Sequence, residues 1–249
     1  MGLTVHFKLA APAGCTAAQA KKLVASMRRV AVRFYIEGLV GRVLPITADT
    51  KTLRRFATDW LVLSIPGEDN TSTGVEVGPT EGFIFCVKVG EDCEPLWLGL
   101  CRYPSTVRFQ GRELRTRKGA GWQFSGFSKT QYASLHGWEH FLRCHRAVVE
   151  LLAGLRPLGL RVRITDEGDY WPRRSVRSLR AELEQMNGLV AAAAGALKDL
   201  GNETNRGSAV QSPIFRHPNF ERVESNGVAR AGSIGEFVNA VRKACPQHD

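Results

Sequence analysis

The chain has 249 residues, of which 43% are hydrophobic and 23% charged, so it can bury a core without disulfides or metals to hold it. No run of 18 apolar residues occurs, and we therefore expect no membrane-spanning helix. The formal net charge of +10 predicts attraction to polyanions such as nucleic acid, or to an acidic protein.

The first elements are a strand and two helices. Residues 3–10 alternate between polar and apolar side chains and predict the strand. Thr16 and Gln19 form the pattern of a capping box, and apolar residues at helical spacing follow it as far as Phe34. A second, shorter helix is expected within residues 49–63.

From about residue 72 to residue 127 the pattern changes to short β-rich runs, separated by Gly, Pro and acidic turns. Such runs predict an antiparallel meander. The glycines in its last part are expected at bends or bulges.

Helical spacing returns after Ser134. Apolar residues from Trp138 to Leu155 predict one helix, residues 160–165 predict a strand, and a 3-4-3-4 seam over 175–200 predicts a long second helix. The seam favours packing against the preceding helix, with a homodimer through residues 175–200 as the alternative. Small residues in its second half permit close approach of another helix.

These elements predict an α+β fold: an antiparallel β meander flanked by helices, with a long heptad-patterned helix in the C-terminal half. Residues 1–200 are expected to form a single domain, with 128–134 as the place where it would divide. Residues 201–213 predict a loop or linker. Residues 214–249 form a C-terminal segment, in which a capping box at Ser233 and Glu236 predicts a short amphipathic helix.

The six cysteines are scattered without a C-x-x-C pair, and the first residues lack the features of a signal peptide. We therefore expect free thiols and a cytoplasmic protein. The chain lacks the Walker A, G-x-S-x-G, G-x-G-x-x-G and H-E-x-x-H patterns, so no common catalytic class and no particular cofactor is indicated.

Three of the six histidines lie within ten positions. His136, Glu139 and His140 match the letters of the inverzincin zinc-protease helix over five residues. Both imidazoles would share one helix face, as two zinc ligands must. However, Gly137 interrupts the pattern and no third ligand stands out, so a metal site is the less favoured interpretation. His145 falls on the apolar face, where a histidine is usually hydrogen-bonded within the core.

The stretches GFSKTQYAS, FLRCH and DEGDYW, within about residues 120–200, resemble a family of uncharacterised bacterial proteins of similar length. The resemblance implies a bacterial-type cytosolic protein with a helix–strand–helix second half. It implies no activity and no functional residue.

The strand at 160–165 leads into an acidic turn that contains Asp166 and Asp169. Open sheets present ligands just past the carboxyl ends of strands, and carboxylates there could hold Mg²⁺ or act as an acid–base pair. Three further candidates could converge on the same place: Lys129, Tyr132 and His145. The alternative is that the acids pair with the arginines that follow and cap the next helix.

A second constellation is basic and includes six cations: Arg102, Arg108, Arg112, Arg115, Arg117 and Lys118. Aromatic residues interleave with them. A β surface that carries cations and aromatics can hold a single strand of nucleic acid, with phosphates on the cations and bases on the rings. The alternative is that the aromatics face the core and the arginines form a solvated face.

Two functional hypotheses follow. The first is a cytosolic binding protein without enzymatic activity, whose ligand is a polyanion or an acidic partner. The second is a metal-dependent hydrolase that uses Asp166, Asp169 and the region from His136 to His145.

Overall fold

The computed structural model describes residues 3–64, 72–116, 118–119, 121–203 and 212–230. Its strands are β1 (Thr4–Ala10), β2 (Arg42–Val43), β3 (Asp59–Ser64), β4 (Ser72–Val77), β5 (Glu81–Lys88), β6 (Leu96–Arg102), β7 (Thr106–Phe109), β8 (Arg112–Arg115), β9 (Gln123–Lys129) and β10 (Arg161–Asp166). Its α-helices are α1 (Ala17–Ile36), α2 (Thr50–Phe56), α3 (Trp138–Ala153), α4 (Val176–Glu203) and α5 (Phe220–Arg230). Short 3₁₀ helices are η1 (Gln131–His136), η2 (Arg156–Leu158) and η3 (Pro213–Arg216).

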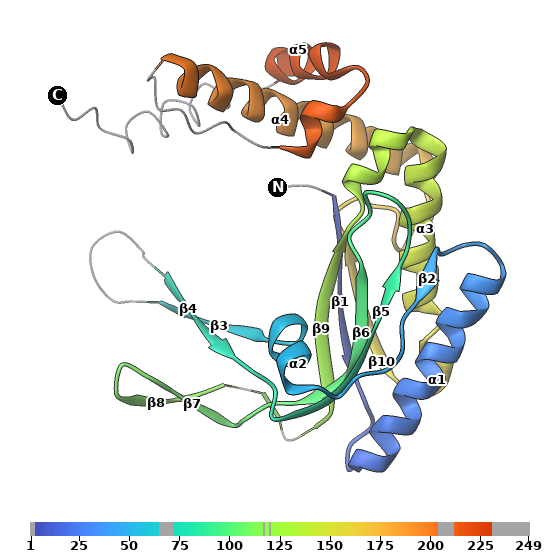
Figure 1. Ribbon diagram of the computed structural model, residues 1–249, viewed down its shortest axis with the longest axis vertical. Coiled ribbons are helices and arrows are strands. Elements are labelled where there is room, and N and C mark those ends of the chain that lie inside the picture. Colours follow the sequence, from blue (N-terminus) through green and yellow to red (C-terminus); the bar gives the residue numbers. More distant parts are fainter. Residues whose placement is uncertain (1–2, 65–71, 117, 120, 204–211, 231–249) are drawn as a thin grey trace.

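The centre of the molecule is an antiparallel sheet in the order β10-β1-β9-β6-β5-β2, which confirms the α+β prediction (Figure 1). Along the chain β1, α1, β6, β9, α3 and β10 form a β-α-β-β-α-β unit, and β5 and β2 extend one edge. Helices α1 and α3 both pack on one face of this sheet (Figure 1). Of the described helices, α2 covers the opposite face over β5 and, through the stacking of Phe56 on Trp97, over β6; we call the rest of that face the open face.

Alternation along β1 separates the two faces. Val5, Phe7 and Leu9 are buried in the core beneath the helices. His6 and Lys8 point the other way and are exposed on the open face. A strand that lies between a core and solvent has this period of two.

Local signals fix the helix starts. The Thr16 hydroxyl accepts from the backbone N–H of Gln19, whose side chain accepts from the backbone N–H of Thr16, so the predicted capping box is confirmed. Asp49 caps α2 by accepting from the backbone N–H of Thr52. The second predicted helix therefore exists, but it ends at Phe56, and residues 59–63 of the predicted range belong to β3.

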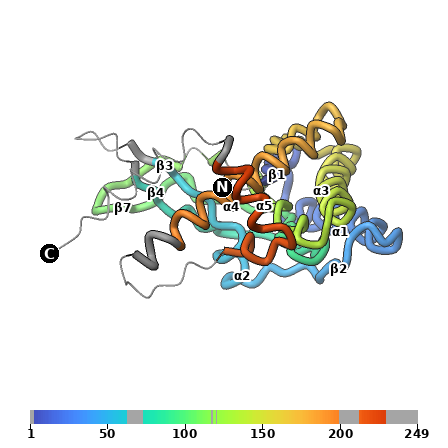
Figure 2. Tube along the Cα trace, turned by 90° about the horizontal axis from the view of Figure 1, so that it is seen from above, coloured from blue at the N-terminus to red at the C-terminus, as the bar shows by residue number. Residues whose placement is uncertain are grey.

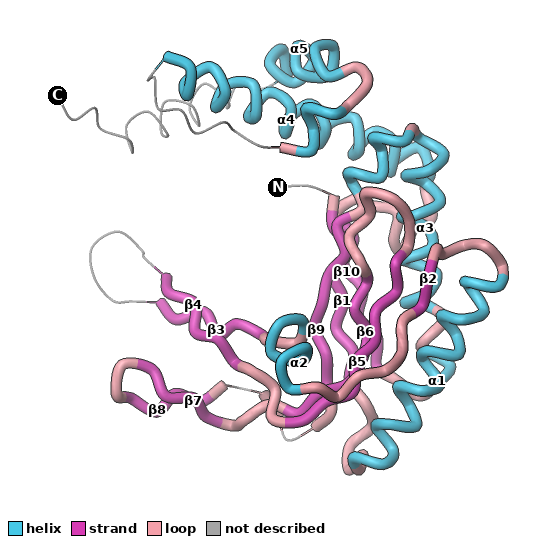
Figure 3. The backbone as a smooth tube through the Cα atoms, in the orientation of Figure 1, coloured by secondary structure: helices cyan, strands magenta, loops and turns pink. Residues whose placement is uncertain are grey.

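Two separate ribbons extend from the sheet on the side of the open face. Strands β3 and β4 form one ribbon, and β7 and β8 form the other (Figures 1 and 3). A two-stranded ribbon has little stability of its own in water. The open face looks toward the space between these ribbons and α4 (Figure 1).

The predicted pairing of the two long helices is wrong. Helix α4 crosses the end of the sheet, where Leu179 and Leu183 join the main core, and its most extensive helix contact is with α5 (Figures 1 and 2). The apolar stripe of α3 is already covered by the sheet and α1, so it offers no seam to α4. The small residues in the second half of α4 do lie against a helix, since Gly195 contacts Glu224 of α5. Nearer the start of α4, Gly188 and Gly227 of α5 pack backbone to backbone.

The C-terminal part differs from the prediction in two further respects. Helix α5 is missed by the pattern because its sequence, FERVESNGVAR, has few apolar residues and an internal glycine. The predicted end of the long helix at Gly201 is wrong, because α4 continues to Glu203. Residues 204–211 of the predicted loop and the helix expected after Ser233 lie outside the described residues. Within the described part of the chain, no helix is both long and apolar enough to cross a bilayer.

Candidate functional site on the open face of the sheet

The zinc-protease pattern is divided between two helices. Gly137 has a φ of 92° and forms the N-cap of α3, so His136 belongs to η1 and His140 to the first turn of α3. Their rings remain neighbours, with centroids 5.1 Å apart. His136 Nε2 lies 2.9 Å from a carboxylate oxygen of Asp92, and His140 Nε2 lies 3.0 Å from the backbone carbonyl of Glu91. Both imidazoles therefore already have partners from the loop before β6.

Glu139 does not join the two histidines. It lines a groove between α1 and α3, together with Phe34 and Leu39. Among the residues that the structure describes, no three His, Cys, Asp or Glu side chains are placed to hold a metal ion. The predicted ligand set of His136, Glu139 and His140 thus does not come together.

Two thiols that are far apart in the sequence, those of Cys93 and Cys144, lie beside these histidines. Cys144 Sγ is 3.6 Å from His140 Nε2, and its thiol also interacts with that of Cys93. The hydrogen bond with Cys144, followed by burial, raises the pKa of Cys93, and the same bond lowers the pKa of Cys144. Both residues are buried, and all five described cysteines are free thiols.

His145 and Asp166 do come together, in a buried chain of hydrogen bonds. Thr130 Oγ1 lies 2.9 Å from His145 Nδ1, and His145 Nε2 lies 3.2 Å from Asp166 Oδ2. An ionised carboxylate can only accept, so Nε2 carries the proton. The Thr130 hydroxyl is the hydrogen-bond partner of Nδ1 on the other side of the ring.

Asp166 is held by further donors. Its carboxylate also accepts from the backbone N–H groups of Gly168 and Trp171, each at 2.8 Å. Burial by itself would raise the pKa of Asp166, but these bonds and the one from His145 outweigh burial and lower it. The side chains of His145 and Asp166 have no exposed surface, and Thr130 is buried as well. These hydrogen bonds therefore fasten the ends of β9 and β10 to α3. Because the three side chains are buried, no substrate can reach them in this conformation.

The other candidates around the acidic turn lie elsewhere. The Asp169 carboxylate is half-exposed and pairs with Arg173 at 3.2 Å, which is the predicted alternative of acids pairing with the next arginines. The Lys129 ammonium stands 6.0 Å from the centre of the Tyr132 ring. Within the described residues, no hydrogen bond or ion pair joins the side chains of Asp169, Lys129 or Tyr132 to that of His145.

The basic stretch does not form one mixed surface. Arg102, Arg108, Arg112 and Arg115 are exposed, the last three on the β7–β8 ribbon, while Arg117 lies outside the described residues. Lys118 forms an ion pair with Asp59. The interleaved rings of Tyr103, Trp122 and Phe124 are buried. These three aromatic residues therefore face the core, as the alternative interpretation of the basic stretch expected.

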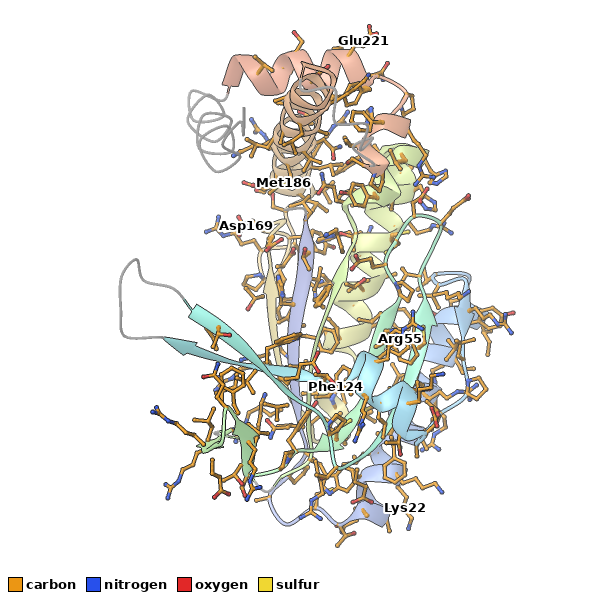
Figure 4. All side chains as sticks on the ribbon, turned by 60° about the vertical axis from the view of Figure 1, so that its left-hand side comes forward. Lys22, Arg55, Phe124, Asp169, Met186 and Glu221 are labelled. Atoms are coloured by element: carbon orange, nitrogen blue, oxygen red, sulfur yellow. The ribbon has the colours of Figure 1, made fainter. Side chains whose placement is uncertain are left out.

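A cleft of about 800 Å³ lies instead on the open face (Figure 4 looks toward it). Its floor is formed by two cross-strand rows on β10, β1 and β9: Thr165, His6 and Phe127, then Arg163, Lys8 and Ser125. Its walls come from the end of α2, the start of β3 and the residues before and within β6.

The cations of this cleft are unusual in their placement. Lys8 lies directly opposite Arg163 in the register of β1 and β10, and both are exposed. Arg55 of α2 adds a third cation to the lining. Within the described part of the chain, none of the three forms an ion pair.

The acids of the cleft are already engaged. Asp59 pairs with Lys118 and accepts from the backbone N–H of Trp60. Glu94 accepts from the backbone N–H of Lys129 at 3.1 Å. The local balance therefore favours an anionic ligand.

Aromatic rings share the cleft with these cations. Trp60 and Phe127 are each 56% exposed. Phe56 and Trp97 are stacked on each other with ring centres 3.9 Å apart. The cleft thus offers both positive charge and accessible ring surface.

Comparison of the chain with protein-family models, with curated proteins and with solved structures gave no match.

Proposed function

We propose that this protein binds a polyanion, and specifically nucleic acid, on the open face of its sheet. The observation that carries the proposal is that two cations, Lys8 and Arg163, lie directly opposite each other on neighbouring strands and form no ion pair with any described residue. Like charges directly opposite each other destabilise a sheet. A bound phosphate would convert that repulsion into attraction to a shared partner.

The rest of the basic surface supports the same ligand. Arg108, Arg112 and Arg115 extend along a ribbon that projects on the side of the open face (Figure 1). These exposed arginines lie outside the cleft and do not contact a ligand bound in it. They raise the local concentration of polyanions and the rate of association. The net charge of +10 acts in the same direction.

The cellular setting belongs to the proposal too. A cytoplasmic location would give the protein access to nucleic acid and would keep its thiols reduced, in keeping with the five free cysteines of the described residues. An acidic protein partner is the alternative ligand, and the experiment below distinguishes it.

The test measures the affinity of a labelled 20-nucleotide strand by fluorescence anisotropy between 50 and 200 mM salt. The double variant Lys8→Ala/Arg163→Ala is compared with Lys21→Ala/Lys22→Ala, which removes the same charge from α1 on the other side of the sheet (Figure 4 labels Lys22). For single strands each lost phosphate contact lowers the salt slope by about 0.7, so the first variant should lose about 1.4.

The control pair should keep the wild-type slope. An equal loss in both variants would show that only net charge matters and would overturn the assignment of the site. Undetectable binding of the wild type at 50 mM salt would overturn nucleic acid as the ligand and leave the acidic protein.

A further inference from the structure

We propose that the open face selects single-stranded nucleic acid, because Trp60 and Phe127 stack on unpaired bases. This inference rests on the proposed function, since it names the form of the polyanion that the same cleft binds. It has its own support in the two rings, which the charges do not explain.

The first reason to expect base stacking is that two exposed aromatic rings line the same cleft. A single exposed aromatic residue is ordinary on a protein surface. Here two large rings, each 56% exposed, line one cleft that also holds Lys8, Arg55 and Arg163. Cations along a groove and aromatic faces beside them are the two parts of a site for single strands.

Trp60 is supported from below by a glycine. A Cβ atom at Gly74 on β4 would lie 2.9 Å from Cε3 of Trp60, so the indole rests directly on the glycine backbone of the neighbouring strand. One side of the ring is thus occupied by the ribbon, and the exposed side is free for a base.

Phe127 stands in the floor of the cleft. On β9 the residue two positions before it on the same face is the small Ser125, and across the sheet its neighbour is His6, with ring centres 6.1 Å apart. The Phe127 side chain is 56% exposed. Its ring therefore remains accessible from the solvent side.

The phosphate contacts lie one row away from the stacking surface. Lys8 follows His6 by two positions on β1, which corresponds to about 7 Å along the strand. A nucleotide whose base stacks on Phe127 can thus place its phosphate near Lys8 and Arg163. Arg55 stands at the wall, 5.1 Å from the centre of the Phe56 ring.

A double helix cannot use these rings. In a duplex each base face is already stacked on its neighbours, and the protein meets phosphates and groove edges. Only the charges of the cleft would therefore contribute to the affinity for a duplex. The aromatic surface should therefore appear as a preference for single strands.

The experiment uses the full chain and four probes of one length: a thymidine strand, a uridine strand, a 20-base-pair duplex and an abasic strand. We expect the wild type to bind the thymidine or uridine strand at least tenfold more tightly than the duplex or the abasic strand. Phe127→Ala and Trp60→Ala should each weaken binding to that strand by about fivefold to a hundredfold, the range for one stacked base. Both should leave abasic-strand binding unchanged.

Tyr35→Ala is the control, because Tyr35 is a similarly exposed ring on α1; it should behave as the wild type. Equal affinity for the abasic and thymidine strands, or unchanged affinity in both ring variants, would overturn base stacking while leaving polyanion binding intact. Failure of the wild type to bind any probe would overturn both proposals. Unfolding curves in urea show whether each variant remains folded.

Discussion

Thr130→Val is the sharpest test of the buried hydrogen-bond chain that fastens β9, α3 and β10 together. Valine has nearly the shape of threonine, so the substitution leaves no cavity and removes only the hydroxyl. His145 Nδ1, fully buried, then loses the partner that now lies 2.9 Å away. A buried polar atom left without a hydrogen-bond partner costs about 1–3 kcal/mol, and we expect the free energy of unfolding to fall by that amount.

Urea unfolding at pH 7, followed by circular dichroism, measures this change. The matched control is Thr165→Val, which removes an exposed hydroxyl from β10. It should change stability by less than about 0.5 kcal/mol, as surface substitutions do. Equal stability of the two variants would refute the claim that the Thr130 hydroxyl satisfies the imidazole.

Three further predictions concern pH, helix packing and thiol reactivity. The pKa of Asp166 is lowered in the fold, so its carboxylate stabilises the protein above its unfolded pKa of about 3.9, and that stability is lost as the pH falls through the folded value. In urea titrations Asp166→Asn should therefore be less stable than wild type at pH 7, with the difference shrinking below about pH 4; a constant difference would contradict this. Gly227→Ala would drive a Cβ atom into the Gly188 carbonyl oxygen and should cost about 1–3 kcal/mol, measured by urea unfolding; an unchanged midpoint would show that α4 and α5 do not pack this closely. In a Cys245→Ser chain a thiol reagent at pH 8 should modify Cys15 first, because the other described cysteines are buried; rapid modification of two or more thiols in the folded protein would contradict this.

The sequence predicts those elements whose signals are local. The capping box at Thr16 and the alternation in β1 depend on neighbouring residues, and both are confirmed. The partner of α4 depends on which apolar faces the sheet has already covered. Heptad spacing carries no information about that, so the seam indicated the wrong helix.

The candidate site is only partly visible in the sequence. His145 is confirmed as a core histidine, and its pairing with Asp166 agrees with the expectation that the two could converge. Lys8 and Arg163 each stand at an exposed position of an alternating strand, but only the register of β1 and β10 places them opposite each other. Trp60 was hidden within a range predicted as helix, where its exposure could not be foreseen.

The measurement that tests the central claim most directly is ultraviolet crosslinking of the full chain to a single-stranded oligonucleotide, with the attached peptides identified by mass spectrometry. A strand that lies across the open face should crosslink to peptides that contain Trp60, Phe127 or His6. Crosslinks confined to α1, α4 or α5 would place the strand on another surface and contradict the account.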